Sequence, residues 1–158
     1  MTDSNKRNFL LNELPKILKT LSSETEGNFG LMTPQHMVEH LTLTIKTTAK
    51  EYGGERETPP TNGQLGFQKF IKNGSVLQHR PSDKKKVDLP PLKYNSLSEA
   101  VSHMPEAIRR FYAFWDANPE HSPYSSFMGE VSFEDMELFH YMHLRFHFWQ
   151  FGLIPEYP

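Results

Sequence analysis

One segment of the sequence, from Phe133 to Phe151, limits the possible folds more than any other part of the chain. Ser132 is a good N-cap, Asp135 follows in the capping-box position, and Gly152 stands where a helix would end. These signals predict a helix, yet its apolar side chains point in several directions at about 100° per residue. A helix that is apolar nearly all the way round must be buried on several sides, either in a core or at a contact between subunits.

Three further segments have apolar residues at helical spacing, two of them between clear start and stop signals. Pro15 interrupts the first segment, so that helix should either start near Asn12 or kink. With the C-terminal helix they predict an all-α fold, a four-helix bundle in a single domain spanning residues 1–158. The expected segments run from about Asn5 to Leu21, from the cap at Thr33 and Pro34 to a stop at Gly53-Gly54, and from the capping box Ser96–Glu99, through a bend at Pro105, to a stop at Asn118-Pro119.

A long connection, Gly53 to Asn95, separates the second and third of these helices and is rich in proline. Only Leu65 to Lys72 has a short helical or strand-like pattern within it. So long a connection inside a small domain is usually functional or partly disordered. In a bundle it could cover one open end.

The composition excludes several classes of protein. No cysteine is present, so disulfides, thiolate metal ligands and cysteine nucleophiles are excluded. A net charge of −2 with both signs mixed argues against a nucleic-acid-binding protein, and the basic run Lys84–Lys86, flanked by aspartates, is typical of a solvated loop. The sequence contains no run of about 18 apolar residues, so it does not predict a membrane span. The polar start of the chain lacks the apolar core of a signal peptide. We therefore expect a soluble, cytoplasmic protein.

The histidines carry the strongest indication of chemistry. On the C-terminal helix His140, His143 and His147 follow the spacing i, i+3, i+7, which places them on one face. Two imidazoles four residues apart on a helix can bind a single ion, as in helical zinc sites. On the second helix His40 lies beside the apolar stripe and should face inward, whereas His36 lies farther round, near the helix start.

These positions predict a divalent-metal site formed by His40, His143 and His147. The alternative is that histidines on an apolar face are core residues bonded to neighbouring polar groups, and this interpretation is favoured for His140. Three bare imidazoles buried together without an ion would leave polar nitrogens unsatisfied, which is unfavourable. No Gly-rich phosphate loop, nucleophile elbow or His-Glu-x-x-His motif is present. The remaining histidines, in polar or turn-like contexts, are expected at the surface: His79, His103 and His121.

Two segments resemble the DinB/YfiT-like metalloenzyme superfamily. Gly30-Leu-Met-Thr-Pro-Gln-His-Met-Val-Glu-His40-Leu is similar to its second-helix signature, and more closely to a branch with the run Met-Thr-Pro-Gln-x-Met-x-x-His-Leu. His143-Leu-Arg-Phe-His147-Phe-Trp-Gln-Phe-Gly152 is similar to the final-helix pattern of that branch, His-x-x-x-His followed by Gln-Phe-Gly. The resemblance covers the second and fourth helices well, the first loosely and the long connection poorly.

The resemblance implies a four-helix bundle, often dimeric, with a divalent metal, zinc or nickel, on one histidine of the second helix and two of the fourth. The matching positions are His40, His143 and His147. His36 stands where the branch has Gln, and Phe146 stands where it often has a further His. Neither departure touches the three ligand positions. Some relatives transfer small thiols onto electrophiles, while others are classed as metal-dependent hydrolases.

Two functions remain open from the sequence, and no catalytic residue is assigned. In the first, three protein ligands leave a fourth position on the metal that activates water or a low-molecular-weight thiol, so the protein is a hydrolase or a thiol transferase acting on a small-molecule substrate. Gln150, one turn after His147, could orient a ligand or substrate. In the second, the chain is a non-catalytic bundle, metal-stabilised or ligand-binding. A fourth protein ligand, such as His36 or His140, would favour that second function.

The C-terminal helix also predicts assembly. Its histidines occupy one face, and Leu144 and Phe148 can pack within the bundle, which leaves Leu138, Met142 and Trp149 on another face. Exposed together, these three would form an apolar patch that is unfavourable in a soluble monomer. We expect a two-fold homodimer through this face, unless the first helix or the long connection covers it.

Overall fold

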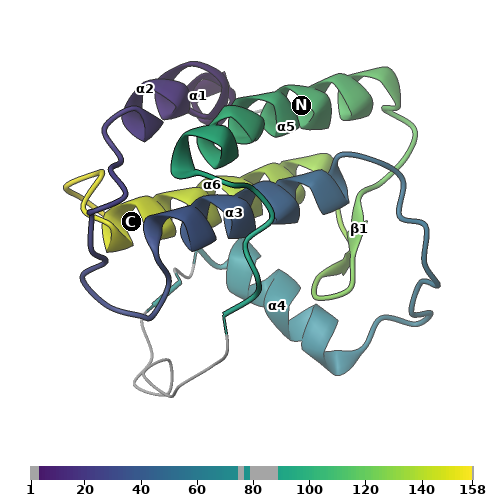
Figure 1. Cartoon of the computed structure of the whole chain (residues 1–158). Coiled ribbons are helices and arrows are strands. Elements are labelled where there is room, and N and C mark those ends of the chain that lie inside the picture. The colour runs from purple at the N-terminus through teal and green to yellow at the C-terminus, as the bar shows by residue number, and fades with distance from the viewer. Residues whose placement is uncertain (1–3, 75–76, 79–88, 158) are drawn as a thin grey trace.

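The computed structural model describes residues 4–74, 77–78 and 89–157, and this part of the chain is mainly helical with one two-stranded sheet (Figure 1). The expected all-α class is confirmed. The elements are α1 (Ser4–Asn8), which continues through a π-helical stretch (Phe9–Glu13) into α2 (Leu14–Leu18), then α3 (Pro34–Thr48), α4 (Asn62–Lys72), α5 (Leu97–Ala117), the antiparallel strands β1 (Tyr124–Ser125) and β2 (Gly129–Glu130), and α6 (Phe133–Gln150).

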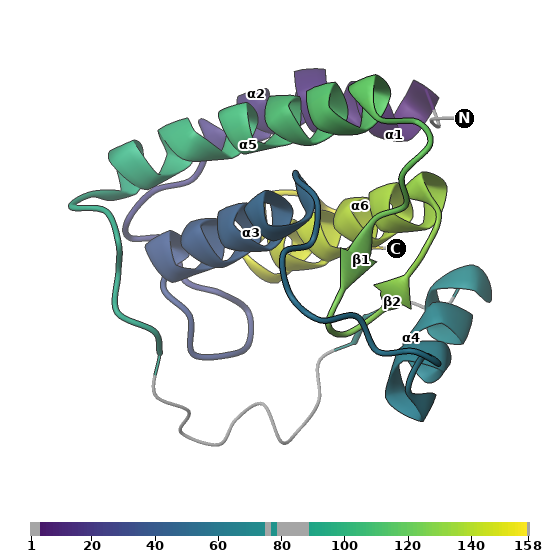
Figure 2. The same cartoon turned by 90° about the vertical axis from the view of Figure 1, so that its right-hand side faces the viewer.

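The helices other than α4 lie in two layers, which Figures 1 and 2 show from two directions. The upper layer holds α1 and α2 with α5, and the lower layer holds α3 and α6. α3 makes its most extensive contact with α5 across the layers and also contacts α6, while α4 packs against α6 from below. Buried apolar side chains from both layers form the core, among them Leu14, Met37, Leu41, Met104 and Phe148.

α6 begins and ends where the sequence predicts. The Ser132 hydroxyl accepts a hydrogen bond from the backbone N–H of Asp135 (3.1 Å), and Gly152 after the helix has a φ of 69°, a conformation that favours glycine. Leu144 and Phe148 are buried in the core, as expected. Although α6 is apolar on most sides, no helix in the described part of the chain is long and apolar enough to cross a membrane.

The face of α6 that carries Leu138, Met142 and Trp149 is covered by other parts of the same chain. Met142 is buried, Leu138 packs against the core, and the half-buried Trp149 indole stacks on Tyr157 with ring centroids 5.5 Å apart. Phe29, in the loop before α3, lies against the same indole. The exposed patch from which we expected a homodimer is therefore not found among the described residues. The homodimer itself stays a prediction.

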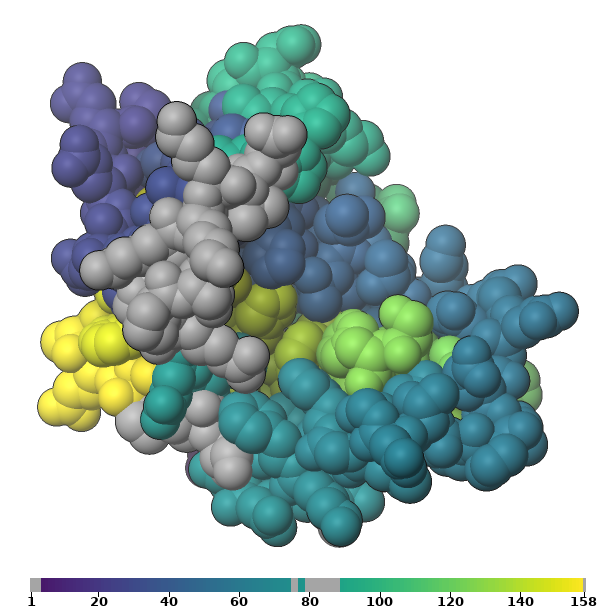
Figure 3. All heavy atoms as spheres, turned by 90° about the horizontal axis from the view of Figure 1, so that it is seen from below, coloured from purple at the N-terminus to yellow at the C-terminus, as the bar shows by residue number. Residues whose placement is uncertain are grey.

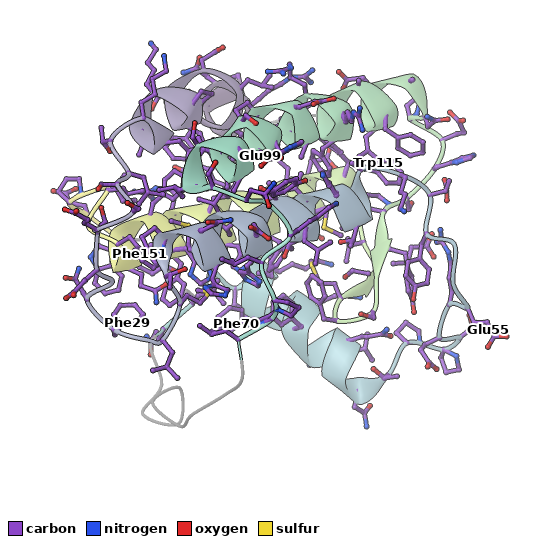
Figure 4. The ribbon with its side chains drawn as sticks, in the orientation of Figure 1. Phe29, Glu55, Phe70, Glu99, Trp115 and Phe151 are labelled. Atoms are coloured by element: carbon purple, nitrogen blue, oxygen red, sulfur yellow. The ribbon has the colours of Figure 1, made fainter. Side chains whose placement is uncertain are left out.

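α3 starts at the expected cap but ends earlier than expected. The Thr33 hydroxyl accepts a hydrogen bond from a backbone N–H of the first turn (3.2 Å), and Pro34 occupies that turn. The expected end at Gly53-Gly54 is wrong, because α3 ends at Thr48. The Thr48 carbonyl, one of the last that the helix leaves free, accepts a hydrogen bond from the indole of Trp115 on α5 (2.7 Å). Figure 4 shows this indole beside the end of α3.

The first helical segment accommodates Pro15 through its π-helical stretch. The segment is helical from Ser4, close to the expected start at about Asn5, so the alternative start near Asn12 is wrong. The backbone N–H of Leu14 donates to the carbonyl of Phe9, in the i→i−5 pattern of a π-helix. Proline has no N–H, and its ring clashes with the carbonyl four residues earlier in a regular α-helix. A wider turn immediately before Pro15 relieves that clash without ending the helix.

The long connection between α3 and α5 contains one regular helix, α4, within its described residues. The Thr61 hydroxyl accepts a hydrogen bond from the backbone N–H of Gln64 (3.1 Å), and Gln64 Oε1 accepts one from the backbone N–H of Thr61 (3.0 Å), which is a complete capping box. The sequence did not distinguish between a helix and a strand for Leu65–Lys72, and this segment is helical. The run Lys84–Lys86 and His79 lie outside the described residues.

α4 is hydrogen-bonded to a short β-hairpin, formed by β1 and β2, that the sequence did not predict. The side-chain amides of Gln64 and Gln68 donate to the carbonyls of Ser126 (3.1 Å) and Met128 (2.6 Å) in the hairpin turn. Seen from below, α4 lies alongside this hairpin (Figure 3). Each strand has two residues, which is too short for the alternating pattern by which strands are recognised in a sequence.

A buried hydrogen bond connects the two layers and generates the first prediction. The Tyr112 hydroxyl of α5 donates to Glu137 Oε2 of α6 (2.6 Å), and both residues are buried. We expect Tyr112→Phe to lower the free energy of unfolding by about 1–3 kcal/mol, because a buried carboxylate loses a hydrogen bond. Urea denaturation measures the change. Tyr141→Phe, on the half-buried ring of another tyrosine on α6, is the matched control and should change stability by less than about 0.5 kcal/mol; equal effects of the two substitutions would contradict the prediction.

Candidate metal centre

Three histidine side chains meet between α3 and α6. His40 lies near the middle of α3, and His143 and His147 lie one turn apart on α6. The Nε2 atom of His143 is 3.0 Å from Nε2 of His40 and 3.2 Å from Nε2 of His147. One ligand atom from each ring lies within 4.8 Å of the other two, so the group could hold a divalent metal ion. The fold thus brings together the three histidines that the sequence singled out.

The spacing and inclination of the rings fit a single shared ion. Two nitrogens bound to one tetrahedral zinc at about 2.0–2.1 Å lie roughly 3.3 Å apart, which is close to both Nε2 separations at His143. The ligand atoms of His40 and His147 lie within 4.8 Å of each other. The rings are steeply inclined and not stacked: His40 makes interplanar angles of 90° with His143 and 82° with His147, and those two are inclined at 67° to each other. Nitrogen-bearing edges therefore converge, as metal coordination requires.

Hydrogen bonding within the group does not satisfy the three converging nitrogens. Nε2 of His143 has two close Nε2 neighbours, yet an imidazole nitrogen carries either one proton or one lone pair. It can make a good hydrogen bond to His40 or to His147, but not to both. A divalent cation accepts one lone pair from each ring, so this donor set suits a metal better than it suits a hydrogen-bonded cluster.

The three rings are held in the neutral form that binds metal. Burial lowers the pKa of His40, lowers the pKa of His147 to about 4, and lowers the pKa of His143 well below its ordinary value. For His143 the neighbouring rings add to the effect, because a positive charge there would be repelled by any other in the group. His40 keeps the most contact with solvent of the three, although its ring is partly withdrawn from water. The buried Phe139 stacks on His143 with ring centroids 5.2 Å apart. The group is therefore open to solvent at His40 and enclosed by aromatic side chains at His143.

A chain of two hydrogen bonds orients His147. Its Nδ1 atom lies 2.6 Å from Gln150 Oε1, and the Gln150 amide nitrogen donates to the carbonyl of Phe29 (2.8 Å). Because an amide oxygen only accepts, Nδ1 carries the proton and Nε2 presents its lone pair to the group. Gly30 leaves room for this arrangement, since it has a φ of 83° and a Cβ there would lie 2.7 Å from Gln150 Nε2. The sequence indicates Gln150 as a residue that could orient a ligand or substrate, but no pattern in it predicts the contribution of the Phe29–Gly30 loop.

His140 lies on the same face of α6 but outside the metal group. Its Nε2 atom is 2.6 Å from the Thr48 hydroxyl, and its ring is buried against Phe111 and Phe139. Burial lowers the pKa of His140 to about 3, so the ring is neutral. Its Nδ1 atom has no hydrogen-bond partner among the described residues. These contacts agree with the interpretation of His140 as a core residue.

His36 is also engaged away from the group. Its Nδ1 atom is 2.6 Å from the Thr33 hydroxyl and its Nε2 atom is 3.1 Å from the carbonyl of Pro90. Both ring nitrogens thus have partners on one side of α3. Within the described residues, no further histidine and no carboxylate joins His40, His143 and His147.

The other predicted histidine positions are divided between surface and packing roles. His121 is exposed, as expected. His103 is only half-exposed, because its ring stacks on Tyr94 with centroids 4.2 Å apart. Phe146, where the resembling branch often has a histidine, packs against the ring of His147 with centroids 5.1 Å apart. An aromatic ring therefore occupies the position that a fourth histidine would have had.

Comparisons with known proteins do not assign the chain to a family. No family model matches it, and neither the curated proteins nor the solved structures contain a match.

The buried state of His140 predicts how the metal-free protein responds to acid. The pKa of His140 is about 6.5 in the unfolded chain and is lowered to about 3 in the folded protein, so between these values only the unfolded state takes up this proton. The free energy of unfolding should fall as pH drops through that window, by about 1.4 kcal/mol per pH unit for this histidine. In urea denaturation with a chelator present, from about pH 7 to pH 4, His140→Gln should show a shallower dependence than wild type. Identical slopes would show that His140 is not held neutral by the fold.

The hydrogen bond between His147 and Gln150 generates a prediction about metal affinity. Gln150→Leu removes the acceptor for Nδ1 of His147 at similar volume, and zinc binding should weaken by about 10- to 100-fold. Competition with a chromophoric chelator measures the affinity. Gln150→Glu keeps an acceptor for Nδ1 but loses the donor to Phe29, so it should bind zinc more tightly than Gln150→Leu. Wild-type affinity in the leucine variant would mean that this hydrogen bond does not prepare His147 as a ligand.

Proposed function

We propose that this protein is a metal-dependent enzyme of the DinB/YfiT-like kind, a four-helix bundle in which His40, His143 and His147 hold one zinc or nickel ion. The observation that carries the proposal is the convergence of one nitrogen from each ring within 4.8 Å. The three residues lie in the two segments whose sequences resemble that superfamily. The layered packing of the N-terminal helix and α5 over α3 and α6 supports a bundle of this kind.

The donor set favours catalysis over a purely structural role. Three neutral imidazoles leave the charge of a divalent ion uncompensated, so the ion would act as a Lewis acid that lowers the pKa of a water or a small thiol toward neutrality. Closed structural zinc sites use four protein ligands, whereas only three candidate ligands meet among the described residues. Because the chain has no cysteine, a reacting thiol would come from a cosubstrate.

The protein's own side chains prepare this site before any substrate arrives. Gln150 fixes the tautomer of His147, so that its Nε2 lone pair is available. Burial keeps all three rings neutral near pH 7. Phe139 and Phe146 cover the rings of His143 and His147, which excludes water there. Substrate would therefore approach from the exposed side of His40.

The alternative function is a non-catalytic bundle, in which a metal stabilises the fold or a ligand binds without reaction. A fourth protein ligand would support it. The two residues considered for that role have other partners, since His36 contacts the Pro90 carbonyl and His140 contacts the Thr48 hydroxyl. We therefore favour the enzyme.

Metal analysis tests the ligands directly. We expect the wild-type chain, loaded with zinc or nickel and freed of excess, to retain one ion per chain. His40→Ala, His143→Ala and His147→Ala should each lose stoichiometric metal, because two imidazoles hold a divalent ion poorly. His36→Ala, one turn before His40 on the same helix, is the matched control and should retain it. Full metal content in any of the first three variants would remove that residue from the site.

The reaction is tested with the metal-loaded protein. Simple esters and amides probe hydrolysis, and low-molecular-weight thiols mixed with an electrophile probe thiol transfer. Turnover that requires the ion and disappears in His143→Ala would support the enzyme. A protein that binds one ion and turns over none of these compounds would support the non-catalytic alternative.

A further inference from the structure

A cavity of about 240 Å³ lies over α3, between this helix and the segment from Leu89 to Tyr94. In Figure 1 that segment descends from the start of α5 in front of α3. His40 lines the cavity as well as belonging to the metal group, so a molecule bound in the cavity would lie against a candidate metal ligand. The apolar part of the lining is aliphatic and consists of Met32, Leu43, Leu89, Pro90, Pro91 and Leu92.

The wall opposite α3 is fixed by hydrogen bonds. Glu39 of α3 accepts from the backbone N–H of Lys93 (2.6 Å) and from that of Tyr94 (3.3 Å). Gln35 donates to the carbonyl of Tyr94 (2.8 Å), and His36 contacts the carbonyl of Pro90 (3.1 Å). These bonds use the polar groups of Gln35, His36 and Glu39 to hold the wall in place, so the cavity is preformed, as small-molecule sites usually are.

Three polar groups of the lining matter for a ligand: the Thr42 hydroxyl and the ammonium groups of Lys46 and Lys93. The Thr42 hydroxyl is enclosed, with almost no accessible surface, and has no hydrogen-bond partner among the described residues. A polar atom of a ligand would reach it after a small movement of the lining and would then relieve this unfavourable state. The Lys46 ammonium contacts the Tyr94 hydroxyl (3.3 Å), and none of the ion pairs among the described residues involves it. Thr42 and Lys46 are four residues apart on α3 and so lie on neighbouring turns of one face. Together they offer an anion a hydroxyl donor and a positive charge.

The exposed rim of the cavity is also apolar. Leu43 is 63% exposed and Leu92 is 42% exposed, on opposite walls. A ligand that covers both side chains would remove apolar surface from water, which is favourable in proportion to the area. The volume is below the roughly 300–1,000 Å³ of sites for drug-sized molecules, so the cavity suits a small molecule and not a peptide.

We propose that this cavity binds a small aliphatic carboxylate, whose carboxylate lies at Thr42 and Lys46 and whose apolar chain lies along Leu43 and the proline-rich wall. If the proposed function holds, a carboxylate bound here is of the class released by hydrolysis of an aliphatic ester or amide at the metal centre, since His40 borders both sites. Binding in the cavity does not itself require the metal.

Calorimetric titration with octanoate, octan-1-ol and octylammonium tests the proposal on both the metal-free and the zinc-loaded chain. Octanoate should bind both forms, octan-1-ol about tenfold more weakly, and octylammonium more weakly still, because Lys46 attracts one charge and repels the other. Leu43→Asp should weaken octanoate binding by at least about tenfold through the added negative charge and the lost apolar surface. Leu65→Asp, on an exposed leucine of α4 (43% exposed), is the matched control and should leave binding unchanged.

Two further variants separate the polar contacts. Lys46→Met should weaken octanoate but not octan-1-ol. Thr42→Val should raise the thermal midpoint of the free protein, because an unpaired buried hydroxyl is removed at similar volume, and should also weaken octanoate. Octanoate binding that is unchanged in both variants would overturn the proposed site.

The outcomes also distinguish this site from the metal site. Octanoate binding that needs zinc and persists in Leu43→Asp would mean that the carboxylate binds the ion alone, which overturns the cavity site and leaves the proposed function standing. Octanoate binding to a chain that retains no zinc or nickel would support the cavity site while the proposed function fails. No octanoate binding to the metal-free chain overturns the proposal.

Discussion

Thr48, the last residue of α3, connects three helices, and the position of the metal group depends on that junction. Its hydroxyl contacts His140 of α6 (2.6 Å) and its carbonyl accepts a hydrogen bond from Trp115 of α5 (2.7 Å). Earlier on α3, His40 meets His143, which lies later on α6, so the two helices run antiparallel and the two contacts fix their register. A slip of one residue at the junction would move His40 by about 1.5 Å along the helix axis. Metal ligation tolerates only about 0.2 Å.

Local chemistry was enough to predict the helix starts and the histidine face. Thr33 and Ser132 satisfy free backbone N–H groups within their own first turns, an effect that involves only neighbouring residues. His143 and His147 share a face because they are four residues apart, and His40 follows from its place beside the apolar stripe of α3. The convergence of the three rings then needs only that the two apolar faces pack together.

The features that the sequence did not reveal depend on contacts between distant segments. α3 ends at Thr48, whose carbonyl accepts a hydrogen bond from the indole of Trp115, 67 residues later in the sequence. The Gln150 amide donates to the carbonyl of Phe29, 121 residues earlier. His140 and His143 share one helix face, yet one ring meets a hydroxyl and the other meets two imidazoles. Helical spacing cannot distinguish such neighbours. The rings that cover Trp149 belong to Phe29, in the loop before α3, and to Tyr157, after α6. The residue pattern of α6 alone therefore could not predict that Trp149 is covered.

The loop before α3 contains no candidate ligand, yet its backbone is bonded to α6 twice. The Phe29 carbonyl accepts from the side chain of Gln150, and the backbone N–H of Asn28 donates to the Gln150 carbonyl (2.8 Å). Binding of an ion by the proposed centre should therefore be linked to the ordering of this loop. Thermodynamic linkage is reciprocal, so each would change the equilibrium of the other by the same factor. The amide hydrogens of the loop should then exchange more slowly with solvent when an ion is bound. A molecule that binds Phe29 at the surface would then change the affinity of the three histidines for an ion without contacting them.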